Sequence, residues 1–135
     1  FNMDNIKKFF DTLETGKGSE AIKPFIIPGA TFTCQSDRYK DIKTIAEYAD
    51  ELKEVLIKIL PGAKYEMISI SQADGIYLAY AKFHATHTGP GGPVPATGKT
   101  SVSDYVFAIY TSKEGKVTGV TKIWNDLYSA KMLGW

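Results

Sequence analysis

In the first half of the chain, apolar residues recur three and four positions apart, which is the spacing of amphipathic helices. A first helix is predicted around Ile6, Phe9, Phe10 and Leu13, and a short second one over residues 19–25. A third begins at the capping-box pattern Thr44-Ile-Ala-Glu47 and ends at Pro61-Gly62. Its apolar stripe consists of Ile45, Tyr48, Ala49, Leu52, Val55, Leu56 and Ile59.

From Lys64 onward the pattern changes to alternation, which is typical of strands. Strands are predicted over residues 64–72, 76–88, 100–111 and 116–127, with a short earlier strand around Phe32 and Cys34 and a final helical turn over 129–133. Helices followed by an antiparallel meander predict an α+β fold, in which the helices cover one face of a curved sheet. A length of 135 residues is that of a single domain, here residues 1–135.

Composition narrows the set of partners. A net charge of +1 and a single arginine, Arg38, argue against nucleic-acid binding. The only cysteine, Cys34, excludes an internal disulfide, and two histidines without acidic neighbours do not predict a metal site. The apolar runs are too short to cross a membrane, so we expect a soluble, cytoplasmic protein. Since the chain starts at Phe1, a leader removed from its front is compatible with the sequence.

The strand over 76–88 carries small residues on one face. Its odd positions are Tyr77, Ala79, Ala81, Phe83, Ala85 and His87. Because successive side chains point to opposite faces, three alanines between aromatic rings leave room either for a ligand or for a closely packed helix. His87 would end this face as a polar group, whereas His84 points the other way.

Several motifs follow one another between residues 74 and 134. They are Asp74-Gly75, Ala85-Thr-His87-Thr-Gly89, Pro95-Ala-Thr97-Gly98-Lys99, Glu114-Gly-Lys-Val117, Trp124-Asn-Asp126 and Leu133-Gly134. In this order they resemble the SnoaL-like polyketide cyclase branch of the nuclear transport factor 2-like superfamily. The resemblance implies a cone-shaped antiparallel sheet packed with N-terminal helices, also described as cystatin-like. It further implies that the cone holds a hydrophobic small molecule.

The resemblance also implies site residues. In such cyclases an aspartate at the end of the last strand removes a proton next to a carbonyl, and a histidine assists it. The corresponding positions are His87 and either Asn125 or Asp126. Neighbours on a strand face opposite sides, so the choice depends on whether a bulge near Gly119 shifts the strand. Predicted substrate contacts are Tyr105, which is also a candidate oxyanion donor, with Tyr77, Phe83, Trp124 and Tyr48.

Two functions remain open at this point. The first is a cofactor-independent cyclase, isomerase or dehydratase that uses acid–base chemistry on a hydrophobic carbonyl compound. The second is a non-catalytic ligand-binding, dimerisation or protein-interaction module of the same fold. Epoxide hydrolysis is disfavoured, because the relatives that catalyse it use an Asp–Arg–Asp set and Arg38 is the only arginine of this chain. Relatives imply a homodimer formed through the exposed face of the sheet.

Overall fold

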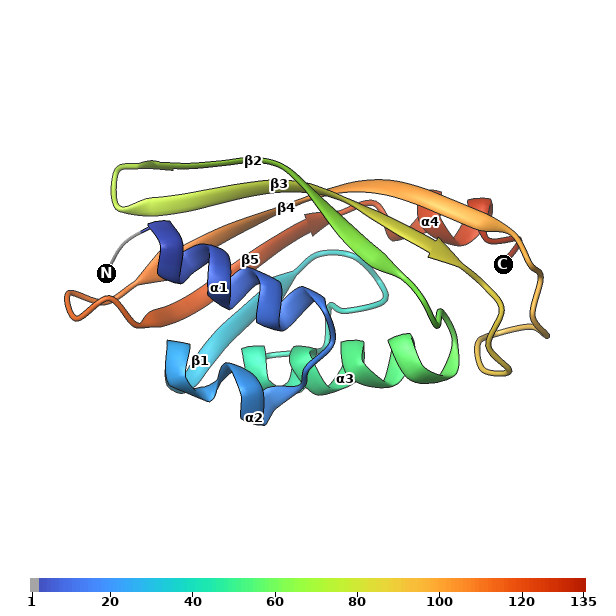
Figure 1. The fold of residues 1–135 in the computed structure, drawn as a ribbon, viewed down its shortest axis with the longest axis horizontal. Coiled ribbons are helices and arrows are strands. Elements are labelled where there is room, and N and C mark those ends of the chain that lie inside the picture. Colours follow the sequence, from blue (N-terminus) through green and yellow to red (C-terminus); the bar gives the residue numbers. More distant parts are fainter. Residues whose placement is uncertain (1–2) are drawn as a thin grey trace.

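The computed structural model describes residues 3–135 and is shown in Figure 1. The helices are α1 (Met3–Glu14), α2 (Ser19–Ile22), a 3-10 turn (Lys23–Phe25), α3 (Ile45–Lys58) and α4 (Asp126–Met132). The strands are β1 (Ile26–Cys34), β2 (Lys64–Ala73), β3 (Ile76–Thr86), β4 (Thr100–Thr111) and β5 (Val117–Trp124).

A five-stranded sheet in the order β1-β5-β4-β3-β2 forms the body of the protein. β1 pairs with β5 in parallel and the other pairs are antiparallel. The strands arch over α1 and α3, which lie on one face of the sheet (Figure 1). The predicted α+β class with N-terminal helices on a curved sheet is confirmed.

Three predicted elements have bounds that differ by three residues or more, namely β1, the end of β5 and the start of α4, which was predicted at residue 129 and lies at Asp126. β1 starts at Ile26, well before Phe32, and its pairing with β5 shifts register between Ile26 and Thr31. The prediction that the last strand runs to residue 127 is wrong, because β5 ends at Trp124. The side chain of Asn125 accepts a hydrogen bond from the Tyr128 amide, which caps α4 and turns the chain out of the sheet.

The concave face of the sheet forms the core. On β3 the odd positions face inward as predicted, and Tyr77, Ala79 and Ala81 are buried. The α1 stripe, which includes Phe9 and Phe10, packs into the same core. Small side chains on β3 therefore lie under helices along part of the strand and border open space along the rest.

The Pro/Gly loop between β3 and β4 packs against the end of α3. The amides of Gly89 and Gly91 donate to the carbonyls of Ile59 and Lys58, respectively, at 3.0 and 2.8 Å. These carbonyls lack partners within the helix, so the loop satisfies them. A Cβ at Gly89 would lie 2.3 Å from the Lys58 carbonyl oxygen, and only glycine fits there.

Candidate functional site

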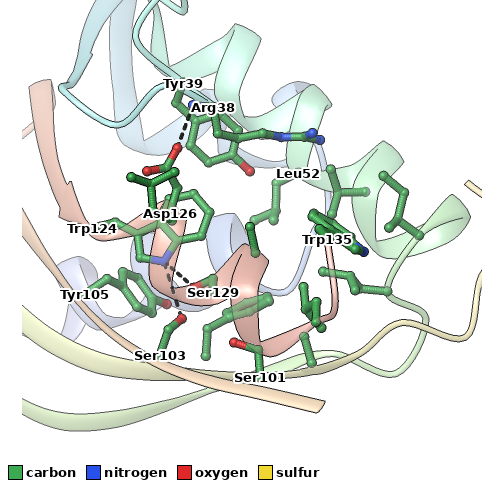
Figure 2. Close-up of a pocket in the computed structure, with 18 of the residues that line it drawn as sticks. Arg38, Tyr39, Leu52, Ser101, Ser103, Tyr105, Trp124, Asp126, Ser129 and Trp135 are labelled. Carbon is green, nitrogen blue, oxygen red and sulfur yellow. Dashed lines mark hydrogen bonds between the residues drawn. The ribbon is translucent and has the colours of Figure 1, made fainter. Parts of the chain in front are cut away.

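A cavity of about 670 Å³ opens at one end of the sheet. Its walls come from the inner faces of β3, β4 and β5, from α3 and α4, and from residues 37–39 (Figure 2). Most of the lining is apolar, including Leu52 and Val55 of α3 and Ile59 directly after this helix. This size and character suit an organic molecule with a hydrophobic body.

The deep end of the cavity holds an ionisable pair joined by a tyrosine. Lys122 Nζ donates to the Tyr48 hydroxyl at 3.2 Å, and that hydroxyl donates to Glu14 Oε2 at 2.8 Å. Glu14 is 1 % exposed and Lys122 is 7 % exposed. Both line the cavity, so this polar end is buried yet borders the space for a ligand.

Burial moves both pKa values toward neutrality. Loss of hydration raises the pKa of Glu14, and the nearby Lys122, Tyr105 and Tyr48 oppose this shift. Loss of hydration lowers the pKa of Lys122, and the charge of Glu14 opposes that shift. Burial thus disfavours the charged form of each group, and the attraction between the two charges opposes that effect.

Aromatic rings surround the Lys122 amine. Its Nζ lies between 4.5 and 5.9 Å from the centroids of Tyr39, Tyr48, Tyr105, Phe107 and Trp124. Ring faces attract a cation, so this cage favours the ammonium form and partly replaces the lost water. The amine is thereby held in one place at the deep end.

One wall of the cavity carries hydroxyl groups. Ser101, Ser103 and Tyr105 lie on the inner face of β4, and Trp124 Nε1 donates to Ser103 Oγ at 3.3 Å and to Ser129 Oγ at 3.1 Å (Figure 2). The Ser101 hydroxyl is buried and has no hydrogen-bond partner among residues 3–135. The Tyr105 hydroxyl is near enough to Glu14 to affect its pKa, but it makes no hydrogen bond of acceptable geometry within that part of the chain.

The mouth of the cavity is more polar. Asp126, the first residue of α4, lines it and is partly exposed. Its Oδ2 accepts a hydrogen bond from the Arg38 backbone amide at 3.0 Å, which ties the segment before α3 to α4. The Arg38 guanidinium reaches back to Glu51 at 3.1 Å.

His87 lies behind the wall and does not line the cavity, contrary to the sequence-based expectation. Its Nδ1 accepts from Trp135 Nε1 at 2.9 Å, and its Nε2 is 2.7 Å from the Gly91 carbonyl oxygen. An indole nitrogen only donates and a carbonyl only accepts, which assigns the neutral tautomer with the proton on Nε2. Both nitrogens are thus used to join the loop to the C-terminus.

The other predicted residues divide into two groups. Tyr48, Phe83, Tyr105 and Trp124 line the cavity, whereas Tyr77 is buried in the core away from it. Asn125 faces a neighbouring surface pocket, and its side-chain oxygen serves the helix cap. The choice between Asn125 and Asp126 therefore does not depend on strand alternation, because neither residue is in the strand.

Sequence reasoning missed Glu14 and Lys122. Glu14 continues the apolar stripe of α1, four residues after Phe10, and alternation places Lys122 on the same face as Trp124. The neighbouring Ile123 is 63 % exposed, so the polar and apolar positions are reversed at this point of the strand. A charged residue on an inward-facing register is the signal that could have revealed the site.

Within residues 3–135, no group of His, Cys, Asp and Glu side chains has the arrangement of a metal site. In the same range, no helix is long and apolar enough to cross a membrane.

No protein-family model matches the chain, and no curated protein matches it in sequence. Solved structures do match it. IdmH from Streptomyces antibioticus, proposed to be a polyketide cyclase, has a TM-score of 0.78 at 16% identity over 98% of this chain and 97% of its own. A proposed SnoaL-like polyketide cyclase from Jannaschia has a TM-score of 0.73 at 16% identity, with coverage of 96% and 90%. An NTF2-like protein from Burkholderia thailandensis has a TM-score of 0.73 at 12% identity, with coverage of 96% and 95%.

Some structures of this fold contain small molecules. A protein from Catenulispora acidiphila with a ketosteroid isomerase-like fold is in complex with trimethylamine, at a TM-score of 0.72 and 10% identity. TerC was co-crystallised with polyporic acid, at a TM-score of 0.72 and 12% identity. The chain thus has the nuclear transport factor 2-like fold of SnoaL-like proteins, a fold that includes proposed polyketide cyclases and hydroxylases.

Proposed function

We propose that the protein binds a hydrophobic carbonyl compound in this cavity and catalyses proton transfer next to the carbonyl group, without a cofactor. The observation that carries the proposal is the apolar cavity whose deep end holds Lys122, Tyr48 and Glu14 in one buried network. Removing a proton next to a carbonyl develops negative charge on its oxygen. Buried donors and a cation placed at that oxygen stabilise this charge.

The lining groups suggest distinct roles. Lys122 and the Tyr105 hydroxyl would receive the carbonyl oxygen, because both line the cavity and both can donate. Asp126 keeps the proposed role of base, since this residue lines the same cavity at the mouth. Glu14 would hold the ammonium of Lys122 in place through Tyr48. We propose a structural role for His87 and Asn125, whose polar atoms are used within the fold.

A proton-exchange assay tests this function without the natural substrate. The probe is 4-acetylbiphenyl in D₂O, and proton NMR follows the loss of its methyl signal as deuterium enters. The wild-type protein should accelerate this exchange. Asp126→Asn should slow it at least about 10-fold, the scale of one general base, while an amide oxygen can still accept from Arg38. Asp104→Asn, on the outer face of β4, is the matched control and should keep the wild-type rate.

The alternative function, a non-catalytic ligand-binding module, predicts a different result in the same assay. Binding of the ketone without faster exchange would indicate a ligand-binding module. Binding is read from fluorescence, because the only two tryptophans, Trp124 and Trp135, both line the cavity. Absence of both binding and exchange would contradict the proposed function.

We also propose that two copies associate through the outer face of the sheet. Large apolar side chains are exposed there on three adjacent strands, namely Leu78, Tyr110 and Ile123. Such residues on neighbouring strands favour a protein partner over water.

A further inference from the structure

Ser101, Ser103 and Tyr105 form a hydroxyl row on β4. The hydrogen bonds within the fold do not use all the donor protons of these three hydroxyls. Ser101 is 2 % exposed and Tyr105 is 3 % exposed, and neither hydroxyl has a hydrogen-bond partner of acceptable geometry within residues 3–135. Ser103 Oγ accepts from the Trp124 indole, so its own proton remains available to donate. Buried hydroxyls without partners are rare in folded proteins, because each costs free energy.

The three hydroxyls share one strand face at alternate positions. The Cα atoms of neighbouring members of the row are therefore about 7 Å apart along the strand, and those of Ser101 and Tyr105 are about 13 Å apart. All three residues line the same cavity. The row extends from the deep end at Tyr105, beside Lys122, toward the side of the cavity where Trp135 lies.

The opposite wall has a different chemistry. Leu52 and Val55 of α3, and Ile59 directly after it, face the cavity with side chains that can neither donate nor accept. Figure 2 shows Ser101 and Ser103 extending from the strand on one side of the cavity and Leu52 on the other. A ligand between these two walls meets hydroxyl groups along β4 and alkyl groups along the wall that faces it.

We infer that the hydroxyl row recognises an elongated compound that carries carbonyl or other acceptor oxygens at two or more points along one edge and is apolar on the other. This inference rests on the proposed function and specifies the class of compound that the same cavity takes. The reacting carbonyl would lie at the Tyr105 end. The Ser101 hydroxyl, whose oxygen is enclosed in this structure, would turn toward the cavity and bind a second, remote oxygen. Ser101 is then a specificity-determining residue that does not take part in the proton transfer.

Three biphenyl probes of similar shape test the inference. They are 4,4′-diacetylbiphenyl with two carbonyl oxygens, 4-acetylbiphenyl with one, and 4,4′-diethylbiphenyl with none. Wild-type protein should bind the diacetyl compound most tightly and the diethyl compound least tightly. One neutral hydrogen bond corresponds to about 3- to 10-fold in Kd, so each added carbonyl should give a step of that size.

Ser101→Ala should remove one of these steps. Its Kd for the diacetyl compound should rise about 3- to 10-fold, while its Kd for the diethyl compound stays unchanged. The thermal midpoint of the ligand-free variant should stay equal or increase, because an unpaired buried hydroxyl is lost. Ser71→Ala, an exposed serine on β2, is the matched control and should leave all three Kd values unchanged.

An infrared measurement adds a readout that packing alone would not change. In the wild-type complex, the C=O stretch of the remote acetyl group should move to lower wavenumber, and Ser101→Ala should reverse that shift. Equal affinity of wild-type protein for the three probes would overturn the inference and leave the proposed cavity function standing. Failure of all three to bind would overturn both.

Discussion

The buried network of Glu14, Tyr48 and Lys122 gives the sharpest prediction about stability. We consider the variants Glu14→Gln and Lys122→Met and the protein that carries both. Each single change leaves the other ionisable group buried without its charged partner. Removing one partner of a buried pair typically costs about 3–5 kcal/mol, so each single variant should lose that much free energy of unfolding.

The structure sets the coupling between the two residues. Lys122 Nζ and Glu14 Oε2 are both hydrogen-bonded to the Tyr48 hydroxyl, so they are no farther apart than the two bond lengths combined, about 6 Å. Two unit charges at that separation attract each other by about 3 kcal/mol at an effective dielectric constant of about 20. The double variant should therefore lose about 3 kcal/mol less than the two single losses added together.

Urea unfolding followed by circular dichroism at pH 7 measures the free energy of unfolding of all four proteins.

The same variants also test the direction of the pKa shifts. Burial raises the pKa of Glu14 above its ordinary 4.5, so folded protein holds this proton longer than unfolded protein does. The wild-type free energy of unfolding should then fall, relative to Glu14→Gln, as pH rises from about 4.5 through the raised folded pKa.

Lys122 gives the opposite slope. Burial lowers its pKa below the ordinary 10.5, so unfolded protein binds the proton more readily between the lowered value and 10.5. The wild-type free energy of unfolding should rise with pH in that window, relative to Lys122→Met. Two results together would refute a coupled buried pair. The loss in the double variant would equal the sum of the two single losses within about 0.5 kcal/mol, and the difference in free energy of unfolding between wild type and each single variant would not change with pH.

Three further predictions concern the rest of the molecule. His87→Ala should lower the free energy of unfolding by about 2–4 kcal/mol, because a buried ring loses both of its hydrogen bonds. It should leave proton exchange per folded molecule unchanged, and loss of exchange in a fully folded variant would instead indicate a catalytic role. Gly89→Ala should destabilise the protein by about 1–3 kcal/mol, because the added methyl group clashes with the Lys58 carbonyl oxygen of α3. Gly98→Ala should cost less, because that position has open space and only its φ of 70° is unfavourable; equal urea midpoints of the two variants would contradict this packing. Ile123→Lys on the outer face should convert a dimer to a monomer in light scattering, and a wild-type protein that is monomeric at micromolar concentration would refute the proposed association.

Hydrophobic patterning predicted much of the fold because most helices and strands carry one clear period. The capping box at Thr44 fixed the start of α3, and the alternation in β3 predicted which side chains face inward. β1 was predicted only around Phe32 and Cys34, since Pro28 and Gly29 interrupt its alternation. Edge strands tolerate such interruptions because one side of the backbone is not paired.

The candidate site was harder to predict, for a physical reason. A lysine in an alternating strand normally faces water, and only the aromatic rings from several elements explain why Lys122 faces inward. These rings come together through tertiary packing, which spacing along the sequence does not reveal. In contrast, Asn125-Asp126 is a helix-start signal in the sequence itself, and treating it as the end of a strand led to the wrong boundary.

The most direct test of the central claim is the indole region of a ¹H–¹⁵N NMR spectrum during titration with 4-acetylbiphenyl. The only two tryptophans, Trp124 and Trp135, line the cavity from different elements. We predict that both indole signals move together and follow one binding curve with a stoichiometry of one ligand per chain. Indole signals that stay in place while amides on the outer face of the sheet shift would show that the cavity is not the binding site.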